Sequence, residues 1–261
     1  MRKGDGLTLA GTKQRVYSDE ELREFSEKIE QIISNRELSI VFQPVVCLAD
    51  RSVFAYEALA RNTSSIFVYP PDMLEAAVAV GRCGELGRLL RQIALEGCPD
   101  HTLFLNIHPD EFEDGLLIEP DDPIFLHAER VYLEITESVP MRYPELCRSI
   151  LREIRSHGIR LAVDDLGSGY SNLKYISDLQ PEIVKLDREL ISGLAKGTRL
   201  HRLVTSIVDL SVNMGAQVVA EGIETVEELG AVMDTGAHFG QGYLLARPTF
   251  PPPEPSWPEV V

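Results

Sequence analysis

The sequence has few cysteines, and they form no redox or zinc motif. Cys47, Cys83, Cys98 and Cys147 are scattered along 261 residues, and no two of them stand in a CxxC pair. Scattered cysteines of this kind are typical of buried free thiols in a reducing compartment. We therefore predict no disulfide framework and a cytoplasmic location.

Long apolar stretches are also missing. No run of residues is apolar and long enough to cross a bilayer. The N-terminal residues Met1–Asp5 lead into no sustained apolar run, as a secretory signal would require. We expect neither a membrane span nor a secretory signal in this chain.

Positive charge is scarce. The chain has 25 Lys and Arg against 41 Asp and Glu, so its formal net charge at pH 7 is −16. Non-specific binding to nucleic acid or to an anionic membrane requires a basic surface, which argues against both classes. An anionic substrate would need metal ions or a local group of Lys and Arg side chains.

Acidic residues collect where predicted strands end. Glu134 follows Val-Tyr-Leu, the pair Asp164-Asp165 follows Leu-Ala-Val, Glu221 follows Val-Val-Ala, and Asn106 follows Leu-Phe-Leu. A carboxylate at the end of an apolar strand is costly unless it is solvated, paired or bound to a cation. Several such carboxylates in one sheet predict an acidic site. Mg²⁺ is a natural partner for that site because it prefers oxygen ligands.

The order of predicted elements favours a barrel. Ser18 and Glu21 form a capping box that begins a helix to about Asn35. The short link between strands 38–42 and 52–60 predicts an antiparallel pair. Helices and strands then alternate, which favours a parallel sheet closed into a barrel. The predicted helices cover 72–97, 144–157, 199–214 and 224–234. The predicted strands cover 102–106, 131–135, 159–164, 182–187 and 216–220, with a short one before Gln241.

These elements predict one α/β domain, a (β/α)8 TIM-type barrel modified by an antiparallel first strand. About 250 residues suffice for such a barrel. Residues 1–17 form a polar lead, 18–249 the barrel, and 250–261 a proline-rich tail. The tail cannot be helical, and we expect it to lie extended on the surface or free.

Strand alternation assigns side chains to faces. Lys185 and Asp187 share a face of their strand, and a lysine inside an apolar strand needs a charged partner. Asp164 and Asp165 would point to opposite faces of a regular strand, but both can reach one site where the strand ends. The loop Leu166–Ser171 contains two glycines, so it can move or can present N–H groups to an anion.

The motifs, taken in order, resemble those of the EAL-domain cyclic-di-GMP phosphodiesterases. The resemblance covers roughly residues 36–249, and its specificity comes from joint occurrence rather than from any single motif. The matching motifs are Gln43-Pro44, Glu57-Ala58-Leu59-Ala60-Arg61, Asn106, Glu134-Ile135-Thr136-Glu137-Ser138, Asp164-Asp165-Leu166-Gly167-Ser168-Gly169-Tyr170-Ser171, Lys185-Leu186-Asp187, Ala220-Glu221-Gly222-Ile223-Glu224 and Gln241-Gly242-Tyr243-Leu244.

The resemblance implies metal-dependent hydrolysis of one phosphodiester bond of cyclic di-GMP, giving linear pGpG. It implies two Mg²⁺ or Mn²⁺ ions, about 4 Å apart, that clamp the phosphate and activate a water. Ca²⁺ is expected to inhibit, because its coordination is longer and looser. The implied ligands of the first ion are Glu57, Asn106, Glu134 and Asp164. The implied ligands of the second are Asp164, Asp165 and Glu221, so Asp164 would bridge the two.

Further roles follow from the same resemblance. Lys185 would orient or deprotonate the water, or offset charge on the phosphorane, and Gln241 would position substrate or a metal-bound water. Gln43, Arg61 and Asp187 would contact the dinucleotide. Glu137, with Ser168, would anchor the loop after Asp165 beside a homodimer interface. The segment 62–78 departs from the family pattern, which usually has an aromatic after Arg61 and a longer loop.

Taken singly, these residues have simpler interpretations. Glu57 alone would be a solvated surface charge, and Asp164-Asp165 a helix cap or turn. Lys185 could form a structural ion pair with Asp187 or with a nearby Glu. The joint order of the motifs favours the site over these interpretations.

Two other functions remain open. The chain could be a catalytically weak or inactive module that binds cyclic di-GMP, or a barrel hydrolase of another phosphate ester. The six histidines show no paired metal-ligand spacing, which argues against the histidine-rich HD-type phosphodiesterases.

Overall fold

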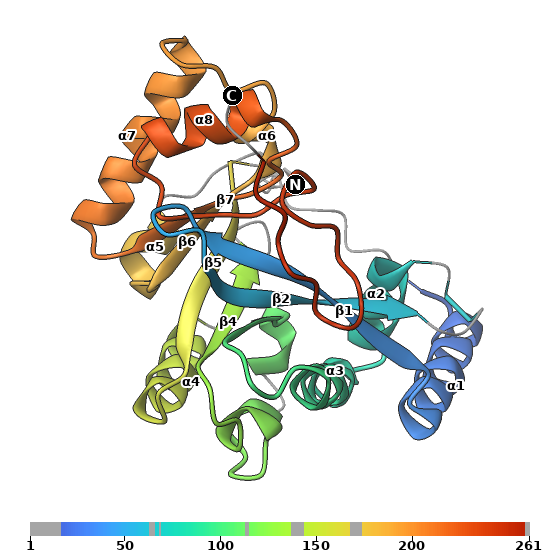
Figure 1. The fold of residues 1–261 in the computed structure, drawn as a ribbon. Coiled ribbons are helices and arrows are strands. Elements are labelled where there is room, and N and C mark those ends of the chain that lie inside the picture. The colour runs from blue at the N-terminus through green and yellow to red at the C-terminus, as the bar shows by residue number, and fades with distance from the viewer. Residues whose placement is uncertain are drawn as a thin grey trace, which may run out of the picture.

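A computed structural model describes residues 17–62, 66–67, 69–112, 115–136, 144–167 and 174–258. Across these residues the strands close into one barrel in the order β1 to β8, with helices around it (Figure 1). This confirms the predicted α/β class and the modified (β/α)8 barrel. The strands are β1 (Leu38–Cys47), β2 (Val53–Asn62), β3 (Leu103–Asn106), β4 (Val131–Thr136), β5 (Arg160–Leu166), β6 (Ile183–Leu186), β7 (Gln217–Ala220) and β8 (Phe239–Gly240).

The helices lie outside the strands, and in the described residues none is long and apolar enough for a membrane span. The helices are α1 (Asp19–Asn35), α2 (Pro70–Ala79), α3 (Cys83–Gly97), α4 (Pro144–Ser156), α5 (Lys174–Leu179), α6 (Arg188–Ile191), α7 (Arg199–Asn213) and α8 (Val226–Asp234). Short 3-10 helices are η1 (Pro109–Phe112), η2 (Leu116–Ile118) and η3 (Pro123–Phe125). Helix α1 begins at the predicted capping box, in which Ser18 and Glu21 bond each other's backbone N–H.

The first strand runs against the rest of the barrel, as predicted. β1 pairs antiparallel with β2 and also with β8, whereas the other neighbouring strands pair in parallel. The link between β1 and β2 is a tight turn in which Arg51 has φ 65° and Asp50 accepts hydrogen bonds from Ser52. So short a link cannot carry the helical crossover that a parallel pair needs.

The single helix predicted over 72–97 was wrong, because the chain forms two helices there. α2 ends at Ala79 and α3 begins at Cys83, with Gly81 between them at φ 69°. Glycine adopts this left-handed conformation without steric cost, so it ends the first helix. The apolar residues keep their helical spacing across the break, which hid it in the sequence.

A layer of apolar side chains fills the barrel beneath the strand ends that carry the polar residues. Its members include stacked pairs of rings, Phe54 with Phe239 at 4.0 Å and Phe104 with Tyr132 at 4.7 Å between centroids. The next inward-facing position along β4 after Tyr132 is Glu134. The packed aromatic layer therefore forms a dry floor under the polar residues.

The proline-rich tail packs on the barrel wall rather than hanging free. It crosses β1 and β2 (Figure 1), where Phe42 and Thr249 exchange backbone hydrogen bonds. The hydroxyl of Tyr56 donates to the carbonyl of Pro253 at 3.2 Å. Trp257 packs against the apolar cluster under α7 and α8. Because β1 and β2 are joined by a short turn and not by a helix, their outer face has no helix from that link to cover it. The tail covers this part of the barrel instead.

Trp257→Ala is expected to lower the free energy of unfolding by about 2 kcal/mol. This is less than the cost for a fully buried tryptophan, because Trp257 is only half-buried. Urea denaturation measures the change. Phe250→Ala, an equivalent change at a tail residue that is 63% exposed, serves as the control and should cost clearly less. Equal losses in both variants would contradict the packing role of Trp257.

Candidate metal centre

Four carboxylates, three on strands β2, β4 and β5 and one directly after β7, surround one buried lysine at the mouth of the barrel. The ammonium nitrogen of Lys185 lies 2.6 Å from Glu134 and 2.6 Å from Glu221. It lies 3.2 Å from Asp164 and 3.7 Å from Glu57. Lys185 is 0% exposed. The predicted need of this lysine for charged partners is confirmed, and its partners are these four acids rather than Asp187.

Asp165 joins this group because the backbone turns at the end of β5. Asp165 has φ 60°, and the register of β5 with β6 shifts between Val163 and Leu166. In a regular strand its side chain would point away from that of Asp164. The left-handed residue lets both adjacent carboxylates reach the same site, as the sequence predicted for a strand end.

The acids form two overlapping groups that could each hold a cation. Carboxylate oxygens of Glu57, Glu134 and Asp164 lie within 4.8 Å of one another, and so do those of Asp164, Asp165 and Glu221. Asp164 belongs to both groups. Hard divalent ions such as Mg²⁺ and Mn²⁺ prefer this all-oxygen donor set.

Burial makes Glu134 and Glu221 costly to ionise without a cation. It raises the pKa of Glu134 well above its ordinary value, and the nearby Lys185 only partly opposes the shift. Burial likewise raises the pKa of Glu221. Burial lowers the pKa of Lys185, but the carboxylates, Asp164 first, outweigh that effect and hold the pKa above its usual range. The lysine therefore stays charged and acts as the cation of the site.

Glu134 has spare coordinating capacity. It is 0% exposed, and apart from its ion pair with Lys185 neither of its oxygens has a hydrogen-bond partner in the described part of the chain. A buried acceptor without a donor is costly, because it has lost its water without replacement. The oxygen of Glu134 that is not paired with Lys185 is therefore available as a ligand for a cation.

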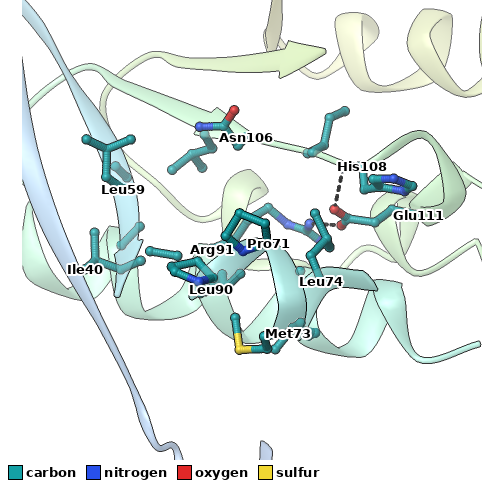
Figure 2. A pocket seen from close by; sticks show the side chains of 18 of the residues that line it. Ile40, Leu59, Pro71, Met73, Leu74, Leu90, Arg91, Asn106, His108 and Glu111 are labelled. Atoms are coloured by element: carbon teal, nitrogen blue, oxygen red, sulfur yellow. Dashed lines mark hydrogen bonds and ion pairs between the residues drawn. The ribbon is translucent and has the colours of Figure 1, made fainter. Parts of the chain in front are cut away.

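Asn106 stands beside Glu134 at the end of the neighbouring strand. The two residues pair in register between β3 and β4, which places their side chains on the same face. Asn106 is exposed and lines a cavity of about 550 Å³ between α2, α3 and the barrel (Figure 2). It can thus offer an amide oxygen from the side of the site next to that cavity.

Two glutamines support Glu57. The side-chain amide of Gln241 donates to Glu57 at 2.6 Å and to Gln43 at 3.1 Å. Gln43 in turn donates to the carbonyl of Ala246 at 3.0 Å. Both glutamines were predicted to contact substrate or a bound water. In the structure they hold the carboxylate of Glu57 in place.

The other two residues that were predicted to contact the substrate, Arg61 and Asp187, lie outside the group of acids around Lys185. Arg61 is exposed, donates to the carbonyl of Ala60 and lines the 550 Å³ cavity. Asp187 accepts a hydrogen bond from the backbone of Glu189 and caps α6, so its carboxylate is engaged outside the acidic group.

A second cavity of about 220 Å³ opens over Glu57, Glu221 and Gln241. Arg188 and Tyr243 line it, and the sequence reasoning did not assign either of them a role. Tyr243 stands directly after Gln241-Gly242 in a motif that carried the resemblance, which was the signal available for it.

Two predicted residues cannot be placed. Glu137 and Ser168 lie outside the described residues, as does most of the loop that was expected to sit beside a homodimer interface. Their anchoring role and the homodimer stay predictions.

The raised pKa of Asp165 predicts how metal binding should depend on pH. Burial, followed by repulsion from Asp164, raises the pKa of Asp165 to about 6. A metal ligand must lose its proton, so the affinity for Mn²⁺ should fall as the pH drops through 6. From pH 7 to pH 5 we expect at least about a tenfold loss, measured by titration calorimetry. Asp165→Asn removes one titrating group and should make the dependence shallower, while Glu134 and Glu221, whose pKa values are also raised, keep part of it. An affinity that does not change with pH would contradict this assignment.

Sequence comparison matches most of the barrel to one family. The family model described as EAL domain matches residues 26–248. The protein named Cyclic di-GMP phosphodiesterase PA2567 of Pseudomonas aeruginosa is 29% identical over 231 residues, covering 84% of this chain and 39% of that protein. The chain spans between 31% and 39% of the length of the first curated relatives it matches.

Solved structures share the fold. The EAL enzyme Bd1971, solved with cAMP and cyclic di-GMP bound, aligns with a TM-score of 0.76 at 26% identity, over 88% of this chain and 68% of that chain. Klebsiella pneumoniae BlrP1, solved as a manganese and cyclic-di-GMP complex, aligns with a TM-score of 0.70 at 29% identity, over 82% of this chain and 56% of that chain.

Proposed function

Because this chain belongs to the EAL domain family, we propose that it hydrolyses one phosphodiester bond of cyclic di-GMP and releases linear pGpG. The observation that carries the proposal is the pair of overlapping acidic groups that share Asp164. Relatives named cyclic di-GMP phosphodiesterases and structural neighbours solved with cyclic di-GMP support it.

The acidic groups suit two divalent cations. We propose that Glu57, Asn106, Glu134 and Asp164 hold one, and that Asp164, Asp165 and Glu221 hold the other. The buried Glu134, whose carboxylate is paired with Lys185 alone, and the ammonium of Lys185 standing among the acids both fit a site built for positive charge. When bound, Mg²⁺ or Mn²⁺ would supply Lewis-acid polarisation of the phosphate and activation of water.

The glutamines and the aromatic floor would keep the site rigid and dry. Gln241, itself held by Gln43, fixes the carboxylate of Glu57 through a 2.6 Å hydrogen bond. The stacked rings of Phe104 and Tyr132 exclude water from below. Pre-positioned charges act strongly in such surroundings, because they need no reorganisation during the reaction.

Lys185 would offset negative charge at the reacting phosphate. Its ammonium lies at the centre of the acids and keeps its proton in their field. We therefore propose that it stabilises the charge that develops on phosphate oxygens and orients the attacking water by donating hydrogen bonds. A role as the proton acceptor is disfavoured, because the surrounding carboxylates stabilise the protonated form.

The test is an assay of purified protein with cyclic di-GMP, with product separated by chromatography. We expect pGpG to form with Mg²⁺ or Mn²⁺ and formation to stop with chelator. Adding Ca²⁺ to the Mn²⁺ reaction should inhibit, because its looser coordination does not hold the geometry. Binding of cyclic di-GMP without turnover would instead assign the chain to the non-hydrolytic binding modules. Cleavage of a different phosphate ester alone would overturn the proposed substrate.

A further inference from the structure

A buried ion triad stands behind the metal centre, on the outer side of the barrel wall. Arg91 of α3 donates to Glu111 at 2.5 Å and to Asp122 at 2.8 Å. The three residues are 2%, 3% and 0% exposed, respectively. Moving charges out of water is expensive, and apolar residues of similar size often give equal or better stability. Stability alone is therefore a weak reason for this triad.

The triad is hydrogen-bonded to the loop that follows Asn106. Asn106 ends β3, and two residues later the backbone N–H of His108 donates to Glu111 at 2.9 Å. The N–H of Glu111 donates back to the carbonyl of His108 at 2.9 Å. Figure 2 shows Glu111 joined to both Arg91 and His108. The chain leaving Asn106 is thus tied to helix α3.

A glycine on α3 makes this arrangement possible. Gly87 lies one helical turn before Arg91, and a Cβ atom built on it would lie 2.1 Å from a carboxylate oxygen of Glu111. A methyl group there would push the carboxylate away, and that movement would cost its bonds to Arg91 and His108. The close approach explains a glycine at a helical position where alanine is intrinsically favoured.

We propose that the Arg91–Glu111–Asp122 triad is a positioning device that fixes Asn106 as a ligand at the metal centre. The inference rests on the proposed function, because it takes Asn106 as one of the ligands. Glu111 belongs to neither acidic group and acts through the backbone of His108. Outer contacts that orient a ligand typically change metal affinity 10- to 100-fold when they are removed.

The test is Mn²⁺ binding by titration calorimetry, well below the unfolding temperature. Glu111→Gln and Gly87→Ala are each expected to weaken binding about tenfold while the circular dichroism spectrum is retained. Asn106→Ala should weaken binding to a similar degree. The decisive variant combines Asn106→Ala with Glu111→Gln, which should bind no more weakly than Asn106→Ala alone, because the two residues act in one chain of contacts.

Glu96→Gln provides the matched control. Glu96 is on the same helix and undergoes the same substitution, but its ion pair is with the exposed Arg36 at 2.7 Å rather than with the triad. Its loss should leave Mn²⁺ binding unchanged. Additive losses in the double variant would overturn the positioning role, and so would loss of the fold in both Glu111→Gln and Gly87→Ala. Absence of Mn²⁺ binding in the unmodified protein would instead overturn the proposed metal centre, and this inference with it.

Discussion

Asp164→Asn is expected to lower the rate of cyclic di-GMP hydrolysis by roughly a thousandfold, because several kcal/mol of charge stabilisation are lost. Asp164 is the only described residue that belongs to both acidic groups. The substitution removes an anionic ligand from each of them. The fold should survive, since an asparagine oxygen can still accept the hydrogen bond from the backbone of Asp165. Steady-state rates with saturating Mn²⁺ measure the effect, and thermal melting checks the fold.

Asp209→Asn is the matched control for this change. Asp209 lies on the exposed face of α7, belongs to neither acidic group, and undergoes the same chemical substitution. Its rate should stay at the wild-type value. Near-wild-type hydrolysis by Asp164→Asn would refute the bridging assignment, and a comparable loss in Asp209→Asn would show that the assay reports something other than the site.

Lys185→Met is expected to destabilise the metal-free protein by about 3 kcal/mol, because buried carboxylates lose their counter-charge. The pKa values of Glu134 and Glu221 are already raised by burial and would rise further. A raised carboxyl pKa in the folded state means that stability falls as the pH rises through it, so the loss should be larger at pH 8 than at pH 6. Saturating Mn²⁺ should restore the melting temperature, since the cation replaces the ammonium.

The same variant separates stability from catalysis. With Mn²⁺ present, kcat should remain roughly a hundredfold low while KM changes little, as expected for a charge used in the transition state. Lys185→Arg keeps the positive charge and should recover part of the metal-free stability, but not full kcat, because the guanidinium is bulkier. Lys196→Met removes an exposed lysine paired with Asp234 and is the neutral control. A rise in KM alone would make Lys185 a ground-state phosphate contact.

The carboxylates at the strand ends could be predicted because their positions depend on two local features of the sequence, the apolar run and the residue that follows it. Apolar runs set the strands, and the residue that follows each run must lie at the barrel mouth. Glu57 shows where this rule stops, since it lies inside the ten-residue strand β2 and not at its end. Only its place in the Glu57-Ala58-Leu59 motif identified it. Motif resemblance and strand reasoning therefore contributed different members of the same site.

The contacts that support the site could not be derived from the sequence. Glu111 and Asp122 lie 20 and 31 positions after Arg91 in the sequence. Nothing local distinguishes these three residues from solvated surface charges. Their pairing depends on how α3 packs on the loop after β3. The break at Gly81 was missed for a related reason, because packing against the barrel decides whether a helix continues through a glycine.

The left-handed conformation of Asp165 restricts which amino acid can occupy that position. Among non-glycine residues, only asparagine, aspartate and histidine are clearly enriched at positive φ. Of these, aspartate alone carries a carboxylate. Glutamate would keep the charge but would strain the backbone, whereas glycine or asparagine would relieve the backbone but remove the charge. The turn at φ 60° thus favours aspartate over glutamate at position 165, so that a backbone angle, and not the metal chemistry alone, contributes to the choice between the two acids.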